Sequence, residues 1–290
     1  MSFPQRLGII GGSGLYELPG LEAVRSLRVQ TPWGEPSDEI VVGRLGDAEL
    51  AFLPRHGRGH RLAPSEVNYR ANIAAMKSLG VTDLLSLSAV GSLRADLPPG
   101  HFVIVDQYVD RTQGRAGSFF GDGIVAHVSL AHPVCARLGD HLQAALGARG
   151  IAHARGGTYV TIDGPQFSTL AESRLYRAWN CDVVGMTNLP EARLAREAEL
   201  CYAAVAMVTD FDCWHPEHDA VTVAAVIAAL NANAAHAKAL VADVAGPVAS
   251  DVQGAACACR RALDHAVITA PGARDPKALA RLAGIAGRVL

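Results

Sequence analysis

The chain has 290 residues, half of them hydrophobic and 19% charged, which is enough apolar material for a large buried core. Its net charge of -2, without a basic block, argues against a protein that binds nucleic acid through a positive surface. No apolar run reaches the roughly 18 residues of a membrane-spanning helix, and the first residues lack a signal-peptide pattern, so we expect a cytoplasmic protein.

Short β-rich runs alternate with helical patterns along the chain. The expected strands are residues 7–10, 49–53, 83–88, 102–105, 157–162 and 200–208. The expected helices are residues 68–79, 133–149, 170–179, 190–199, 221–244 and 276–290. This alternation predicts an α/β fold, a single domain over residues 1–290 with a central mixed β-sheet flanked by helices. Within it, residues 246–290 are expected to form a C-terminal loop, to about residue 271, and then the last helix.

Two turn-like segments after predicted strands carry small residues that suit an anion. Residues 11–14 read Gly-Gly-Ser-Gly and include Ser13, and residues 86–92 include Ser88 and Ala89. Glycines allow backbone amides to approach an anion closely, and hydroxyl groups add further donors. Each segment taken alone is equally compatible with an ordinary tight turn.

A third segment, residues 54–61, holds three arginines and two histidines directly after a strand. The guanidinium of Arg55 can bind phosphate oxygens bidentately, with His56 beside it, although a solvated loop is the alternative interpretation. The His56 and His60 pair lies in a glycine-rich loop without Glu or Cys, which argues against a metal site. Because ligands of open α/β sheets bind at the carboxyl ends of strands, we expect the three segments to meet around one phosphate.

Two acids, Asp210 and Asp212, follow the wholly apolar strand at residues 200–208. A carboxyl group held there is partly removed from water, which raises its pKa towards neutrality. Such a group can donate a proton to a leaving group. The alternative interpretation is that these two acids are ordinary loop residues or cap the start of a helix.

These four segments, in this order, resemble the nucleoside phosphorylase family that contains methylthioadenosine phosphorylases and the trimeric purine nucleoside phosphorylases. Residues 68–73 (NYRANI), 161–168 (TIDGPQFS) and 185–191 (GMTNLPE) resemble further segments of that family, and the resemblance runs from about residue 6 to 245. It implies the nucleoside phosphorylase fold, a homotrimer or a dimer of trimers, and phosphorolysis of a purine nucleoside. It also implies no metal and no organic cofactor, with inorganic phosphate as co-substrate.

The resemblance assigns expected roles to individual residues. Those implied for phosphate are Ser13, Arg55, His56, Ser88, Ala89 and Thr187. Those implied for the nucleoside are Phe167, Met186, Asp210, Asp212, Val223 and Val226, with His127 reaching the site of a neighbouring subunit.

The residues implied for the nucleoside also predict its identity. Adenine offers an acceptor at N7 and a donor at its 6-amino group, which suits a carboxyl at Asp210, whereas a 6-oxopurine suits an amide. Val223 and Val226 favour a 5'-methylthio group over a hydroxyl by about 1–3 kcal/mol. We therefore predict phosphorolysis of 5'-methylthioadenosine to adenine and 5-methylthioribose-1-phosphate, in purine and methionine salvage. Asp210 would assist the leaving purine and Asp212 would orient the site.

Three other functions remain open from the sequence. The first is a 5'-methylthioinosine or inosine/guanosine phosphorylase on the same scaffold, the second a nucleoside-binding protein without turnover, and the third a hydrolase.

Six cysteines in a chain of this length do not predict a disulfide scaffold. Cys257 and Cys259 resemble a C-x-C pair of some archaeal family members, where it can form a disulfide. A disulfide across this spacing is strained, so we expect free thiols in a reducing cytosol.

Overall fold

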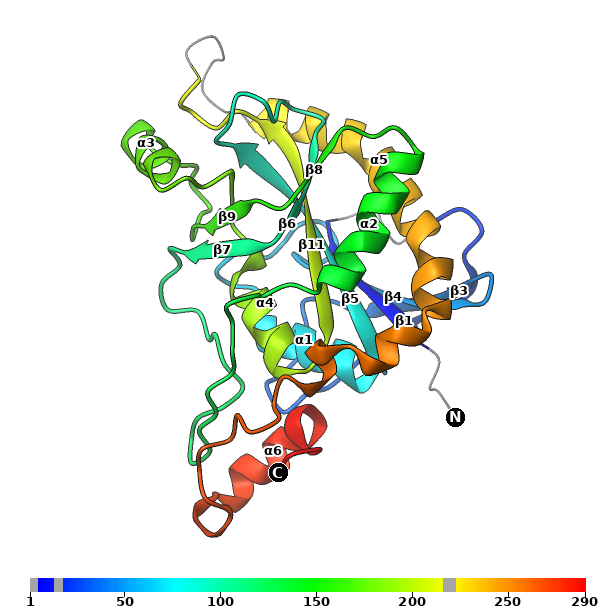
Figure 1. Ribbon diagram of the computed structural model, residues 1–290, viewed down its shortest axis with the longest axis vertical. Coiled ribbons are helices and arrows are strands. Elements are labelled where there is room, and N and C mark those ends of the chain that lie inside the picture. The colour runs from blue at the N-terminus through cyan, green and yellow to red at the C-terminus, as the bar shows by residue number, and fades with distance from the viewer. Residues whose placement is uncertain (1–4, 13–17, 216–222) are drawn as a thin grey trace.

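The computed structural model describes residues 5–12, 18–215 and 223–290, and is built around an eleven-stranded mixed β-sheet (Figure 1). The strands run in the order β2-β3-β4-β1-β5-β10-β9-β7. A branch leaves this row at β5, where β11 pairs with β5, β6 pairs with β11, and β8 pairs with β6. Their bounds are β1 Arg6–Gly11, β2 Glu22–Leu27, β3 Ile40–Leu45, β4 Ala48–Pro54, β5 Val81–Ser92, β6 Phe102–Val105, β7 Gln107–Asp110, β8 His153–Arg155, β9 Thr158–Thr161, β10 Val183–Gly185 and β11 Cys201–Asp210.

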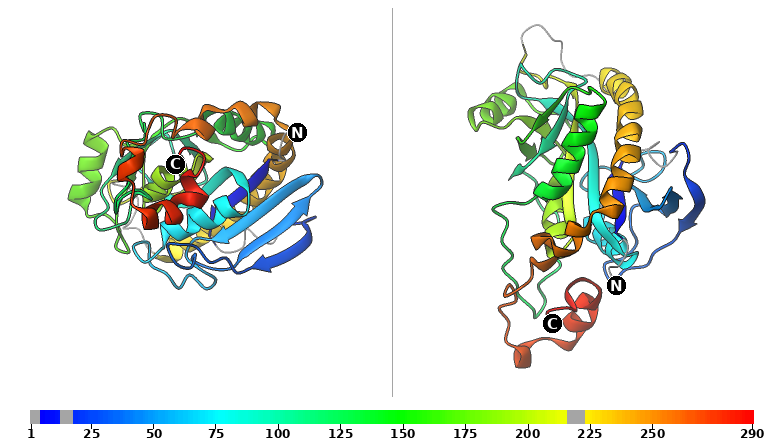
Figure 2. Two further views of the ribbon diagram at one scale, coloured as in Figure 1. Left: turned by 90° about the horizontal axis from the view of Figure 1, so that it is seen from below. Right: turned by 45° about the vertical axis from the view of Figure 1, so that its right-hand side comes forward.

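Helices cover both faces of the sheet, as predicted. They are α1 Tyr69–Ser78, α2 Ala136–Ala148, α3 Leu170–Ala178, α4 Asn188–Glu197, α5 Val223–Ser250 and α6 Pro276–Ala286. Figure 2 shows α2 and α5 side by side over one face, where their apolar side chains share one core cluster. Residues of α1, α4 and α6 share the cluster on the other face. Among the described residues, no helix is long and apolar enough to cross a membrane.

Strand β11 is buried on both sides, which explains its unbroken apolar sequence through Val208. In β11, Ala203, Val205 and Met207 pack towards α2 and α5, while Ala204 and Val208 pack into the opposite cluster. Side chains alternate between the two faces of a strand, so every position of such a strand must be apolar.

The parallel strands bring their carboxyl ends together at one edge. Strand β1 lies parallel to β4 and β5, and pairs Gly11 with Pro54. Strand β11 lies parallel to β5 and pairs Asp210 with Gly91. The segments predicted to bind the anion and the purine therefore start from neighbouring positions.

The chain differs from the predicted elements mainly in the C-terminal region. Helix α5 continues to Ser250, through Gly246 and Pro247, where a loop was predicted. Val244 and Val248 are fully buried in this last part of the helix, and their packing offsets the local cost of glycine and proline. Short 3-10 turns follow it (Val252–Ala256 and Ala258–Arg261), and the last helix ends at Ala286 instead of residue 290.

Five strands were missed from the sequence: β2, β3, β7, β8 and β10. The strands β7, β8 and β10 have only three or four residues each, and β2 is almost entirely exposed at the sheet edge. Segments this short, or lacking an alternating apolar pattern, give little periodicity to recognise.

Candidate active site

A cavity of about 240 Å³ opens where the carboxyl ends of β5 and β11 meet. It brings together most of the residues selected from the sequence, although Arg55 and Asp212 are 157 positions apart. The predicted residues that line it are Arg55, His56, Ser88, Ala89, Phe167, Met186, Thr187, Asp210 and Asp212.

Arg55 lies almost fully buried at this cavity, with its guanidinium bonded mainly to the protein. Its Nε donates to Glu191 Oε2 at 2.9 Å, and its Nη2 donates to Ser86 Oγ at 2.6 Å and to Ile10 O at 3.1 Å. Its Nη1 donates to Leu87 O at 3.1 Å. A guanidinium has five N–H bonds, so these contacts leave one Nη1 hydrogen uncommitted among the described residues. The predicted bidentate contact with phosphate is therefore wrong for this arrangement, because the fork faces Glu191.

Glu191 is held by a buried polar network that the sequence did not reveal. Its Oε1 accepts a hydrogen bond from the Tyr202 hydroxyl at 3.0 Å, and Asn188 Nδ2 donates to that hydroxyl at 3.2 Å. Burial alone would lower the pKa of Arg55, but the Glu191 carboxylate more than offsets it and the pKa is raised. Arg55 is therefore charged, and its position is set by Glu191.

Two hydroxyl groups that line the cavity, those of Ser88 and Thr187, lie near the Tyr159 hydroxyl, which itself lacks a well-formed hydrogen bond. Ser88 Oγ and Thr187 Oγ1 are both buried, and neither makes a well-formed hydrogen bond with any residue that the structure describes. A buried hydroxyl left unpaired costs about 1–3 kcal/mol, so such groups are normally satisfied by protein, water or ligand. Both hydroxyls are therefore available to a ligand in the cavity.

His56 contributes in a different way from that expected. Its Nδ1 lies 2.9 Å from Leu62 O, which can only accept, so Nδ1 carries the hydrogen and neutral Nε2 is an acceptor. Burial, followed by the charge of Arg55, lowers the pKa of His56 to about 4. Its ring stacks on that of His60, at 4.3 Å between centroids. At neutral pH the imidazole is therefore uncharged, and a contact from His56 to an anion uses its backbone N–H.

The two acids also line the cavity, and both have raised pKa values. Asp210 accepts hydrogen bonds from Thr209 Oγ1 and from the backbone N–H of Asp212, both at 2.7 Å, and burial raises its pKa. Asp212 is only 4% exposed, and its Oδ2 has no hydrogen-bond partner among the described residues. Burial, with a further contribution from the charge of Asp210, raises the pKa of Asp212 to about 6. Burial therefore favours the protonated form of both carboxyl groups.

Comparison with known proteins gives the family. Residues 6–245 match the sequence model described as the phosphorylase superfamily. The chain belongs to this superfamily. A Bradyrhizobium diazoefficiens protein named S-methyl-5'-thioadenosine phosphorylase is 60% identical over 284 residues, which cover 98% of each chain.

Solved structures of similar proteins agree with this assignment. A methylthioadenosine phosphorylase from an antarctic soil metagenomic library has 48% identity and a TM-score of 0.92, over 98% of this chain and 99% of that one. A variant of adenosine/methylthioadenosine phosphorylase from Schistosoma mansoni, in complex with methylthioadenosine, has 37% identity and a TM-score of 0.84, over 93% and 99%. The expected resemblance and the nucleoside phosphorylase fold are confirmed.

Of the remaining predicted residues of this superfamily member, some line the cavity, some lie away from it and some are outside the described residues. Phe167 lines the cavity and is 42% exposed, and Met186 lines it as a half-buried side chain. Val223 is 64% exposed and is not among the lining residues, and neither is the exposed His127. Ser13 and the side chain of Val226 lie outside the part of the chain that the structure describes.

Glu191 and Gly91 are the functional residues that sequence reasoning missed in this superfamily member. A Cβ atom on Gly91 would lie 2.9 Å from Asp210 Oδ1 and 3.2 Å from the Cβ of Asp212. The absence of a side chain at this position therefore allows β5 to approach both acids closely. Both residues belong to segments already selected from the sequence, residues 185–191 and 86–92. The sequence did not indicate that Glu191 contacts Arg55 or that Gly91 contacts the two acids.

Proposed function

We propose that the chain catalyses the phosphorolysis of 5'-methylthioadenosine to adenine and 5-methylthioribose-1-phosphate. The observation that carries this proposal is the composition of the cavity, which is lined by two buried hydroxyls without a well-formed hydrogen bond, by a buried cation and by two acids of raised pKa. The names of the relatives and the methylthioadenosine in the Schistosoma mansoni complex support the same substrate.

Phosphate would bind on the Arg55 side of the cavity. The donors are the hydroxyls of Ser88 and Thr187, the uncommitted Nη1 hydrogen of Arg55, and the backbone N–H groups of His56 and Ala89. Ser13 would add a further hydroxyl. Phosphate held there stabilises the positive charge that develops on the sugar as the glycosidic bond weakens.

The purine would bind against the acid pair. As the bond between N9 and C1' breaks, its electrons move to the base, and a proton delivered to N7 allows the purine to leave neutral. Asp210 is the proposed hydrogen-bond partner of N7. Asp212, whose pKa is raised to about 6, would share the proton with Asp210 and accept a hydrogen bond from the 6-amino group. Phe167 would stack on the base and Met186 would contact the ribose. General acid assistance of this kind contributes about 10²–10⁴-fold in rate.

The 5' end of the nucleoside would be enclosed by two valines of the same chain and by a histidine of a neighbouring subunit. Val223 and Val226 would form an apolar pocket for the methylthio group once a nucleoside is bound. His127, which is exposed in the single chain, would enter the site of a neighbouring subunit. This arrangement requires a homotrimer or a dimer of trimers.

One assay of adenine release tests the proposed function. We expect turnover of 5'-methylthioadenosine that depends on phosphate and needs no added metal or organic cofactor, because the proposed reaction uses neither. Turnover without phosphate would indicate a hydrolase, and absence of turnover a binding protein. Faster release of hypoxanthine from 5'-methylthioinosine would indicate the 6-oxopurine specificity instead.

A further inference from the structure

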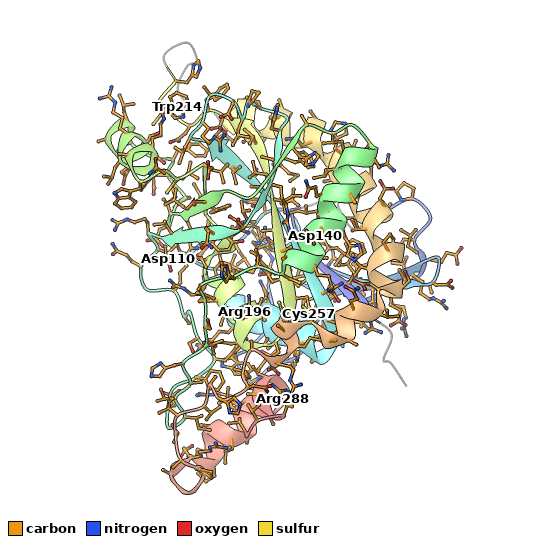
Figure 3. The ribbon with its side chains drawn as sticks, viewed as in Figure 1. Asp110, Asp140, Arg196, Trp214, Cys257 and Arg288 are labelled. Atoms are coloured by element: carbon orange, nitrogen blue, oxygen red, sulfur yellow. The ribbon has the colours of Figure 1, made fainter. Side chains whose placement is uncertain are left out.

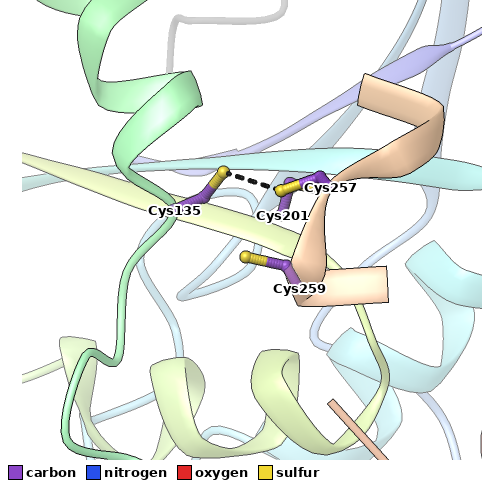
Figure 4. A group of neighbouring side chains, drawn as sticks. All are labelled: Cys135, Cys201, Cys257 and Cys259. Atoms are coloured by element: carbon purple, nitrogen blue, oxygen red, sulfur yellow. Dashed lines mark hydrogen bonds between the residues drawn. The ribbon is translucent and has the colours of Figure 1, made fainter. Parts of the chain in front are cut away.

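Four cysteines from three separate segments of the chain gather at one point. Cys135 precedes α2, Cys201 begins β11, and Cys257 and Cys259 lie in the 3-10 turns that follow α5. Their four Sγ atoms all lie within 4.8 Å of one another. In Figure 4 the side chains of Cys135, Cys257 and Cys259 point towards a common centre.

The spacing of the sulfurs fits a single tetrahedral metal ion. A Zn–S bond of about 2.3 Å in tetrahedral geometry places neighbouring sulfurs about 3.8 Å apart. The sulfurs of Cys135 and Cys257 are separated by 3.7 Å, much more than the bond of about 2.05 Å in a disulfide. An iron–sulfur cluster inserts several irons and sulfides between its cysteines and spreads them further apart.

We propose that Cys135, Cys201, Cys257 and Cys259 together bind one structural Zn²⁺ ion as thiolates. Four soft sulfur ligands in tetrahedral arrangement are a donor set that zinc prefers. All four positions are filled by protein, as in structural sites, whereas catalytic zinc keeps one position open. Three of the cysteines are buried, and the half-buried Cys257 provides the entry path that a metal site needs.

The surroundings supply donors for the thiolates. The guanidinium of Arg137 interacts with Cys201, and Arg260 directly follows Cys259 in the chain. The Nε atoms of both arginines are buried and have no hydrogen-bond partner among the described residues. Asp83 pairs with both guanidinium groups and holds them in place. Such N–H donors beside metal-bound sulfur stabilise its negative charge and orient the ligand.

The position of the cluster gives this zinc a structural role, separate from the proposed reaction. Cys201 starts the strand that ends at Asp210, so the cluster lies at the opposite end of β11 from the cavity. Figure 3 likewise shows Cys257 far from Trp214, which follows the acid pair. The ion would join the start of α2, the start of β11 and the short turns after α5, which have little regular structure of their own. Its binding energy would thus stabilise the fold.

Metal analysis of the full-length chain tests the proposal. The untagged protein is purified with a reducing agent and without chelator or added zinc, and its metal content is measured by plasma mass spectrometry. We expect about one zinc ion per chain in the wild type, and less than about one tenth in Cys257→Ser/Cys259→Ser. The matched control is Cys181→Ser/Cys213→Ser, which changes the two cysteines outside the cluster and should retain the zinc.

A second measurement uses the wild type alone and does not depend on folding of the variants. Replacement of zinc by Co²⁺ should produce thiolate charge-transfer bands and the visible bands of tetrahedral cobalt. The proposal is overturned by a wild type that neither contains nor takes up zinc or cobalt. It is also overturned by an intact mass four hydrogens lower, which indicates two disulfides, by iron with sulfide, or by a cysteine variant that keeps its zinc.

Discussion

Arg55 and Glu191 form a buried ion pair, with Arg55 Nε 2.9 Å from Glu191 Oε2 and side chains that are 2% and 1% exposed. They are 136 positions apart in the sequence. The carboxylate orients the guanidinium so that one Nη1 hydrogen remains for a ligand. Under the proposed function, the pair would therefore link the stability of the fold to the affinity for phosphate.

Breaking this pair should cost both stability and phosphate binding. We expect Arg55→Met to lower the free energy of unfolding by about 3–5 kcal/mol, because Glu191 is left charged and buried. Arg55→Met/Glu191→Met should recover most of that stability and none of the phosphate affinity. Urea denaturation at one protein concentration and the KM for phosphate measure the two effects. As control, Arg44→Met breaks an exposed pair with Asp47 and should cost at most about 1 kcal/mol. A double variant with normal phosphate KM would contradict this interpretation.

The two unpartnered hydroxyls should bind phosphate without stabilising the fold. We expect Ser88→Ala and Thr187→Val each to raise the KM for phosphate about tenfold, through the loss of a hydrogen bond to a charged group. Stability should stay unchanged or rise, because a buried unpaired polar group is removed. Thr161→Val is the matched control, since Thr161 Oγ1 is also buried and unpartnered but does not line the cavity. A loss of stability with unchanged phosphate KM would assign the hydroxyls to the fold instead.

Asp210 should determine both rate and choice of base. We expect Asp210→Ala to lower kcat for 5'-methylthioadenosine about a hundredfold, since proton donation to N7 is lost. Asp210→Asn should in addition raise the relative rate with 5'-methylthioinosine, because an amide can donate to the 6-oxo group. Steady-state kinetics with both nucleosides measure this shift, with exposed Asp96→Asn as control. Near-normal turnover by the alanine variant would remove Asp210 from the mechanism.

The raised pKa of Asp212 predicts a specific pH dependence of stability. Its folded pKa of about 6 lies above the unfolded value of about 3.9, so the folded state binds this proton more tightly. The stabilising contribution is therefore present below about pH 4 and is lost as the pH rises through about 6. Compared with Asp212→Asn, the wild type should lose up to roughly 3 kcal/mol of stability over that interval. Urea midpoints of both proteins across this range test it, and parallel curves would contradict the raised pKa.

Gly91 should be needed for the geometry of the acid pair. In Gly91→Ala the added Cβ would lie 2.9 Å from Asp210 Oδ1, so the carboxylate must move. We expect kcat to fall about ten- to a hundredfold, since small displacements of a catalytic group are costly. The control is Gly284→Ala, where a Cβ meets nothing within 4 Å and activity should not change. Unchanged kcat in Gly91→Ala would show that the acids tolerate displacement.

The sequence by itself determined the elements whose pattern is local. The apolar run of β11 predicted a strand buried on both faces, and Arg55, Ser88 and Asp210 were singled out because each lies at or just after the end of a predicted strand. Strands of three residues such as β10, and the continuation of α5 past Pro247, carried no such pattern.

Only the tertiary structure decided which distant side chains meet. It turned the fork of Arg55 towards Glu191, left Asp212 as the acid with an unbonded oxygen, and brought four cysteines from three segments together. The physical reason is that periodicity along a chain reports which residues are buried. Partners are set by strand register and helix packing, which join positions more than a hundred residues apart.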